Sequence, residues 1–137
     1  MATHLSNADI QAAIVAKLKA STQVTAKVSA LEIREDQWQG TEFVYPNIRV
    51  RMISNRPYES EDCTIIDFTV GIQVHTQDAS TYEADTIAGI IANVLHGHPW
   101  STSSLLISLR TTNLVPAIRS DIRTWRSEVL MTGLASG

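Results

Sequence analysis

Two of the four histidines lie close together in the segment "LHGHPWS", residues 95–101, and together could bind a metal ion. A zinc site needs three or four ligands, and neutral imidazoles are among those it prefers. No sequence spacing places a third ligand beside His96 and His98. The same segment has the features of a helix end, because Gly97 favours a left-handed cap and Pro99 stops a helix. We therefore predict a helix terminus here and no metal site.

The carboxylates Glu59, Glu61 and Asp62 form a short acidic segment that could attract a cation. A calcium-binding loop places oxygen ligands at regular positions over about twelve residues, with a glycine at its centre. This segment lacks such spacing, so we interpret it as a solvated turn. Neither a metal nor any other cofactor is predicted for the chain.

The arginines Arg119, Arg123 and Arg126 could form a basic patch for a phosphate backbone. Two carboxylates interrupt the patch, and Trp125 alone offers an aromatic surface on which bases stack. The whole chain has a net charge of −3, whereas proteins that bind nucleic acid by neutralising phosphates are normally basic. We interpret these arginines as surface residues rather than as a nucleic-acid site.

The sequence carries no recognisable catalytic signature. It lacks the glycine-rich nucleotide motifs, the His-Glu-x-x-His zinc motif and the Gly-x-Ser-x-Gly nucleophile motif. The single cysteine, Cys63, excludes an internal disulfide. The first residues lack the basic and apolar stretches of a signal peptide, and no apolar run approaches the roughly 20 residues that cross a bilayer. We expect neither an enzyme nor a membrane protein.

Hydrophobic periodicity predicts the elements that position these residues. Apolar residues recur at helical spacing in 6–20 and in 80–95, and Ser80 and Glu83 have the spacing of a capping box. Apolar and polar residues alternate in five predicted strands, at 28–34, 46–53, 64–76, 105–110 and 124–132. The polar segments between them are predicted as loops or connections, chiefly 35–42, 54–62 and 111–122.

The predicted fold is a two-layer α+β domain over residues 1–137, with the order α-β-β-β-α-β-β. The clearest strand, 64–76, has five apolar residues in strict alternation, and Gly71 on its polar face indicates a bulge or a close neighbour. Each strand has one polar face, so we predict a mostly antiparallel sheet of about five strands with two helices packed on its apolar face.

The order of these parts resembles that of the tail-completion, or tail-terminator, proteins of long-tailed bacteriophages. The helix "IQAAIVAKLKAS" leads to "VSALEIRED", and a polar loop precedes the proline-led strand "YPNIRVRM". The stretch "IIDFTVGIQVHTQDASTYEADTIAGIIANVLHG" then gives a long alternating strand, a turn and a helix that ends at Gly97. The resemblance covers almost the entire chain and rests on the order of the elements, not on a single motif.

This resemblance implies a structural virion protein without catalytic residues. It implies a homo-oligomer, a hexameric ring that caps the head-proximal end of the tail tube and stops its polymerisation. The implied partners are the tail tube protein and the head–tail connector, and DNA passes through the central pore without specific binding. The implied location is the tail or neck of the virion, with assembly in the host cytoplasm.

We expect the partner contacts to come from the loops 38–45 and 56–62 and from the arginine cluster. The candidate interface residues are Trp38, Arg56, Glu59, Glu61, Asp62, Arg119, Arg123 and Arg126. Two alternatives stay open at this point. One is another neck component, such as a head–tail joining or head-completion protein. The other is a small α+β ligand-binding module or enzyme, which would need polar groups that point into a pocket between sheet and helices.

Overall fold

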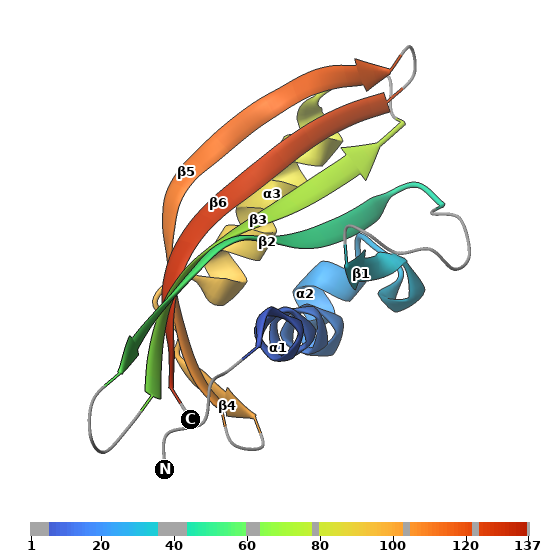
Figure 1. Cartoon of the computed structure of the whole chain (residues 1–137). Coiled ribbons are helices and arrows are strands. Elements are labelled where there is room, and N and C mark those ends of the chain that lie inside the picture. The colour runs from blue at the N-terminus through green and yellow to red at the C-terminus, as the bar shows by residue number, and fades with distance from the viewer. Residues whose placement is uncertain are drawn as a thin grey trace.

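The computed structural model of the protein describes residues 6–35, 44–59, 64–77, 80–102, 105–121 and 124–136. Within these ranges the chain forms one sheet and several helices (Figure 1). The helices are α1 (Asn7–Ala20), α2 (Thr22–Thr25), the 3-10 turn η1 (Ala30–Glu32) and α3 (Tyr82–Leu95). The strands are β1 (Ile33–Glu35), β2 (Asn47–Glu59), β3 (Thr64–Thr76), β4 (Trp100–Thr102), β5 (Leu105–Asp121) and β6 (Thr124–Ser136).

The six strands of the described chain lie in the order β1-β2-β3-β6-β5-β4. β1 runs parallel to β2, and every other neighbouring pair is antiparallel. This confirms the predicted α+β class and the mostly antiparallel sheet, but the sheet has six strands rather than about five. The strand missed is β4, whose three residues are too few to show an alternating pattern.

Two segments predicted as loops belong to strands. β5 continues through 111–121, and its pairing with β6 shifts register at Thr112 and again around Pro116. β2 likewise continues to Glu59, with a register shift between Met52 and Ser54. An inserted residue reverses the in-and-out alternation that follows it, so the period-two pattern is interrupted there although the strand continues.

The strand predicted over 28–34 is wrong for most of its length. The short helix α2 ends before this segment, the 3-10 turn η1 occupies its middle, and only Ile33–Glu35 pairs as β1. Serine hydroxyls begin both helices: Ser21 Oγ accepts a hydrogen bond from the amide of Val24, and Ser29 Oγ accepts one from Leu31. A single helical turn is too short for its periodicity to be visible in the sequence.

The two long helices begin differently. Ser6 Oγ caps α1 by accepting a hydrogen bond from the amide of Asp9 at 3.1 Å. At α3 the predicted capping box is wrong, because the N-cap residue is Thr81 and its side chain makes no cap hydrogen bond.

α3 ends at Leu95, and Gly97 has a φ of +69°, which confirms the predicted helix terminus. No helix in the described ranges has the length and apolar character to span a bilayer.

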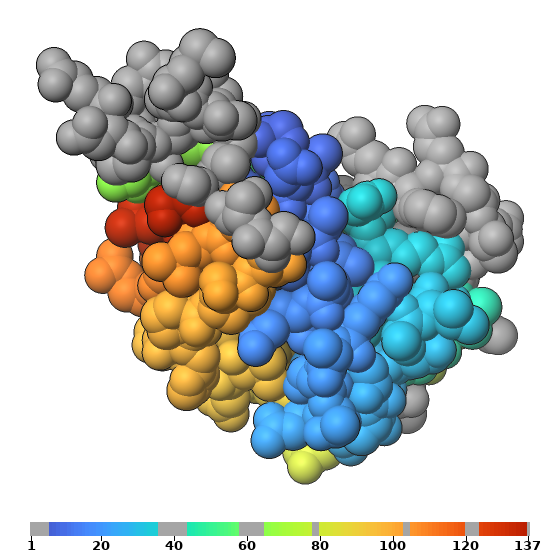
Figure 2. All heavy atoms as spheres, turned by 90° about the horizontal axis from the view of Figure 1, so that it is seen from below, coloured from blue at the N-terminus to red at the C-terminus, as the bar shows by residue number. Residues whose placement is uncertain are grey.

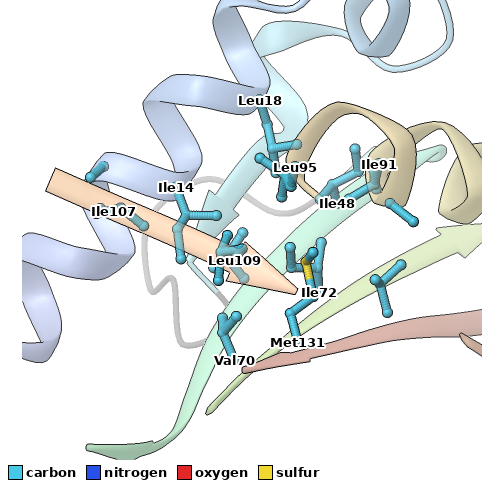
Figure 3. Packing of buried hydrophobic residues seen from close by; sticks show 14 of the residues in the cluster. Ile14, Leu18, Ile48, Val70, Ile72, Ile91, Leu95, Ile107, Leu109 and Met131 are labelled. Atoms are coloured by element: carbon cyan, nitrogen blue, oxygen red, sulfur yellow. The ribbon is translucent and has the colours of Figure 1, made fainter. Parts of the chain in front are cut away.

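The hydrophobic core lies between the sheet and the two long helices. The inner face of β3 contributes five buried apolar residues, from Ile66 to Val74. In Figure 3, side chains of α1 and α3 point toward those of the sheet, among them Ile14, Leu18, Ile91, Leu95, Ile48, Ile72 and Met131. Each fully buried isoleucine or leucine side chain contributes about 1.5–3 kcal/mol relative to exposure, so this layer holds both helices on one face.

The sheet is a curved layer, and α1 and α3 lie on its hollow side (Figure 1). Figure 2, which views this side, shows α1 between the α3–β4 part of the chain and the segment around β1. α1 packs on β1 and β2, whereas α3 packs on β3, β5 and β6. The opposite face of the sheet is therefore left without a covering helix among the described residues.

A candidate interaction surface on the outer face of the sheet

The outer face is the face of the sheet that turns away from α1 and α3. On β3 it comprises the odd-numbered residues from Asp67 to His75, because the even-numbered ones are in the core. Cross-strand partners share a face, so the register assigns the residues of β2, β5 and β6 in the same way.

Arginines are concentrated on this outer face. Five of the eight arginines of the chain have cross-strand partners that place them there: Arg49, Arg51, Arg56, Arg110 and Arg126. Only two carboxylates, Asp67 and Glu128, accompany them among the described side chains. The three lysines, in contrast, all precede residue 28 and lie in or next to α1 and α2.

At the centre of the outer face, Glu128 binds two side chains from other strands. Its Oε2 accepts a hydrogen bond from Arg51 Nε at 3.1 Å and one from Gln73 Nε2 at 3.3 Å. Gly71 lies beneath them, and a Cβ atom there would come within 2.6 Å of Glu128 Oε2. The predicted reason for Gly71, a close neighbour, is thus confirmed, and the register of β3 is regular at this residue.

A second polar group lies toward the end of β3 where His75 faces the same side. His75 Nε2 is 3.1 Å from Gln73 Oε1, and the side chain is almost completely buried. Burial, and to a smaller extent the positive charges of Arg49 and Arg126, together lower the pKa of His75 to about 4. The imidazole is therefore neutral at physiological pH and acts as a polar packing residue.

Apolar side chains lie between these polar groups. Four of them are about half exposed, with exposed fractions of 47–52%: Ile53, Leu106, Ile118 and Leu134. Leu134 borders a hollow of about 340 Å³, whose polar wall includes Asp67, Arg110 and Thr132. Arginine is enriched and lysine depleted at protein–protein interfaces, and the buried centre of an interface is more apolar than its rim. The outer face has arginines and half-exposed aliphatic residues, and the three lysines lie elsewhere.

The structure separates the predicted interface residues instead of bringing them together. Arg56 lies exposed on β2, and Arg126 lies on β6 opposite His75, so both belong to the outer face. Arg119 pairs with Trp125, and its guanidinium lies 5.3 Å from that indole ring on the other face. Trp38, Glu61, Asp62 and Arg123, and the side chain of Glu59, lie outside the described residues.

Sequence reasoning did not select Arg49, Arg51, Arg110 or Glu128 as candidate interface residues. The alternation of "NIRVRM" placed two of these arginines on a polar strand face, but that pattern alone does not say how neighbouring strands align. Once the register is known, residues far apart in the sequence, such as Arg51 and Arg126, lie on one surface.

The histidine segment has a structural role at the edge of the sheet. His96 Nδ1 accepts a hydrogen bond from the amide of Thr111 at 2.9 Å, and the amide of Gly97 donates to the carbonyl of Leu109 at 3.0 Å. Farther along β5, Asp85 Oδ1 accepts from the amide of Ala117 at 2.9 Å. These bonds satisfy edge groups of β5 beyond the short strand β4. No group of three potential metal ligands occurs among the described residues.

A second exposed feature lies at the opposite edge of the sheet, beside β1. A groove of about 470 Å³ is lined by α1 and by residues 31–35. Leu31 and Val44 are highly exposed there, at 77% and 63%. Glu32 fixes this edge, because its carboxylate accepts hydrogen bonds from the amide of Val44 at 2.7 Å and from Arg34 at 3.0 Å.

Comparisons with known proteins give a consistent result. The family model described as "Tail completion protein gp17" matches residues 12–129. A solved chain from the virion of a native gene transfer agent particle has a TM-score of 0.71 and 17% identity, over 93% of this chain and 95% of that chain. A second solved chain has a TM-score of 0.60 and 15% identity, over 98% and 97%. No curated protein matches the sequence.

At these identities, the solved structures show the fold alone. The fold and the family match, which spans most of the chain, together define a structural protein of phage-type particles. More specifically, the chain belongs to the tail completion protein gp17 family. This confirms the resemblance drawn from the order of the elements.

Proposed function

We propose that the protein is a tail terminator. Its subunits form a ring, a hexamer by family resemblance, that caps the head-proximal end of the tail tube and stops its polymerisation. The free side of the ring docks to the connector of the neck. DNA passes through the central pore without specific binding, which is compatible with the net charge of −3.

The observation that carries this proposal beyond family membership is the composition of the outer face. A ring subunit must contact two neighbouring copies and the tube at the same time, and so needs large surfaces suited to protein contacts. The outer face offers arginines such as Arg56 and Arg110 beside half-exposed aliphatic residues such as Leu134. Arginine is enriched at protein interfaces, and apolar residues make up much of their buried centre.

The proposal is tested by tube growth. Purified tail tube protein is polymerised alone, with the protein added before growth, and with the protein added after growth, and tube lengths are measured by electron microscopy. A terminator added early shortens the tubes in proportion to its concentration, and one added late leaves their lengths unchanged but labels one end. An unchanged length distribution with unlabelled ends would contradict the proposal. Binding to the connector alone would assign another neck component.

A further inference from the structure

The outer face of the sheet consists of cross-strand rows that differ in how their polar groups are satisfied. One row crosses β2, β3 and β6 at Arg49, Gln73 and Glu128. Gln73 is only 8% exposed, and its side chain contacts both Glu128 and His75. Arg49 Nε donates a hydrogen bond to Asn47 Oδ1 at 3.0 Å. The polar groups in this part of the face thus find partners within the chain.

Two rows nearer the end of β6 are different. They consist of Arg56, Asp67, Leu134 and Ser108, and of Ser54, Thr69, Thr132 and Arg110. Among the described residues, none of the three charged side chains in these rows forms an ion pair. The rows border the hollow of about 340 Å³, and the half-exposed Leu106 follows them on β5. We call the two rows and Leu106 the open patch, which lies toward the end of the sheet where β6 ends (Figure 1).

Positive charge is concentrated on the outer face. On β2, β3, β5 and β6 this face has five arginines against two carboxylates among the described side chains. Elsewhere the described charges are balanced, with Arg34, Arg119 and the three lysines against Asp9, Glu32, Glu35, Glu83 and Asp85. Two outer faces repel each other, and the other described surfaces offer no acidic surplus. Charge therefore selects an acidic partner of different sequence over a second copy of this chain.

Aliphatic residues in the open patch favour a protein over a polyanion. Leu106 and Leu134 are each 52% exposed, and a partner that covers them with apolar groups would remove this surface from water. A phosphate backbone would satisfy the arginines but would leave both leucines in water and would face the carboxylate of Asp67. The combination fits a protein surface with carboxylates around an apolar centre.

We infer that the open patch docks an acidic, partly apolar surface of the tail tube protein. The choice of the tube as partner rests on the proposed function, because a terminator must recognise the tube before the connector is bound. Arg56 and Arg110 each offer a planar guanidinium that can bind a carboxylate through two hydrogen bonds. Leu106 and Leu134 provide the apolar part of the contact, and Asp67 accepts a donor that enters the hollow.

Two variants and a control test the inference. The charge variant carries Arg56→Glu and Arg110→Glu, and the apolar variant carries Leu106→Ser and Leu134→Ser. The exposed Lys27→Glu is a charge-reversal control outside the outer face. Circular dichroism and thermal unfolding establish that each variant folds, and sedimentation velocity compares its self-assembly with that of the wild type. Binding to preformed tail tubes is then measured at low and at high salt.

The expected result is a loss of tube binding in both variants. Each binds tube ends at least about tenfold more weakly than the wild type, whereas Lys27→Glu binds normally. Wild-type binding weakens as salt rises, and the charge variant loses most of this dependence. A charge variant that binds tubes as tightly as the wild type would overturn the inference.

Three other results would also contradict it. If double-stranded DNA bound the wild type and the apolar variant equally and displaced both from tubes, the patch would be a phosphate site. If the charge variant bound tubes normally but lost binding to the connector, the partner would be wrong. If it failed to self-assemble where the wild type assembles, the patch would belong to the contact between neighbouring copies.

The tube-growth experiment separates this inference from the proposed function. If the wild type and the charge variant shorten tubes equally, terminator function stands and the assigned patch is wrong. If the wild type binds tube ends through the patch but leaves tube length unchanged, the patch stands and terminator function is wrong. A wild type that neither binds nor shortens tubes would overturn both.

Discussion

Arg51 on β2 and Glu128 on β6 form an ion pair across the intervening strand β3, with Nη2 and Oε2 3.1 Å apart. The pair spans β3 because Gly71 has no side chain between them. The side chain of Arg51 is 43% exposed and that of Glu128 only 15%. The ion pair therefore links two strands that are not neighbours in the sheet. Water partly screens the charge of its more exposed partner, Arg51.

Removing the guanidinium should destabilise the fold modestly. In Arg51→Ala the largely buried carboxylate of Glu128 keeps Gln73 as a donor but loses its charged partner. We expect a loss of about 1 kcal/mol in the free energy of unfolding, because exposure of Arg51 limits the value of the pair. Urea denaturation of Arg51→Ala, Glu128→Gln and the double variant measures their coupling. Strictly additive effects would show that the pair contributes nothing.

The glycines provide a matched series of alanine substitutions. At Gly133 a Cβ would lie 2.6 Å from the backbone oxygen of Ser108 and 2.9 Å from Phe68, and backbone cannot yield easily. We expect Gly133→Ala to cost about 1–3 kcal/mol as overpacking. Gly89 in α3 has no neighbour within 4 Å, so Gly89→Ala should stabilise the protein by about 0.5–1 kcal/mol.

The effect of Gly71→Ala on stability should lie between those of Gly89→Ala and Gly133→Ala. The atoms nearest to the new Cβ are the ends of flexible side chains, the Glu128 carboxylate and Ile53 Cδ1. The new methyl group should displace the Glu128 carboxylate and so weaken its ion pair with Arg51. Thermal unfolding of the three variants gives the ranking. A Gly133→Ala variant as stable as Gly89→Ala would contradict the packing around β5 and β6.

The sequence predicts this fold wherever one periodicity continues long enough. The strict alternation in β3 and the helical spacing in α1 and α3 predicted the class, the layers and the buried residues. Prediction failed where the period is interrupted, as at the bulge at Thr112, or where an element is as short as β4 or η1. In those places tertiary packing, not local pattern, determines the backbone.

The candidate surface was harder to predict, because it depends on how strands are aligned. Sequence spacing groups Arg119 with Arg126, yet β5 and β6 place them on opposite faces. Nothing in the sequence relates Arg110 to Arg56, yet the register puts both on the outer face. Pairing between strands distant in sequence is not encoded in any short segment.

The edge of β5 gives a local prediction. His96→Ala removes the acceptor of the Thr111 amide, so this edge should open more easily. We expect the hydrogen exchange of Thr111 to accelerate about tenfold, with a loss of at most about 1 kcal/mol in global stability, because the bond is exposed. His98→Ala is the matched control, since His98 is also exposed but makes no hydrogen bond to β5 within the described ranges. Unchanged exchange at Thr111 in His96→Ala would contradict the assigned role.

His75 should make stability depend on pH. Its pKa is lowered to about 4 in the folded protein, by burial first and then by Arg49 and Arg126, whereas an unfolded chain has the ordinary value near 6.5. Below about pH 6.5 the unfolded state therefore binds a proton that the folded state refuses. The stability contributed by neutral His75 is complete above this pH and is lost progressively down to about pH 4.

The loss should reach up to about 3 kcal/mol at pH 4, as an upper limit from the pKa difference. His75→Gln keeps a polar group of similar reach but cannot titrate, so the wild type minus variant difference isolates this histidine from the carboxylates that titrate in the same range. Urea denaturation at pH 7, 6, 5 and 4 measures that difference. We expect the stability of the wild type to decrease steadily relative to that of His75→Gln as the pH falls. A difference that is constant from pH 7 to pH 4 would mean that His75 titrates alike in both states, and that its burial between Arg49 and Arg126 does not keep it neutral.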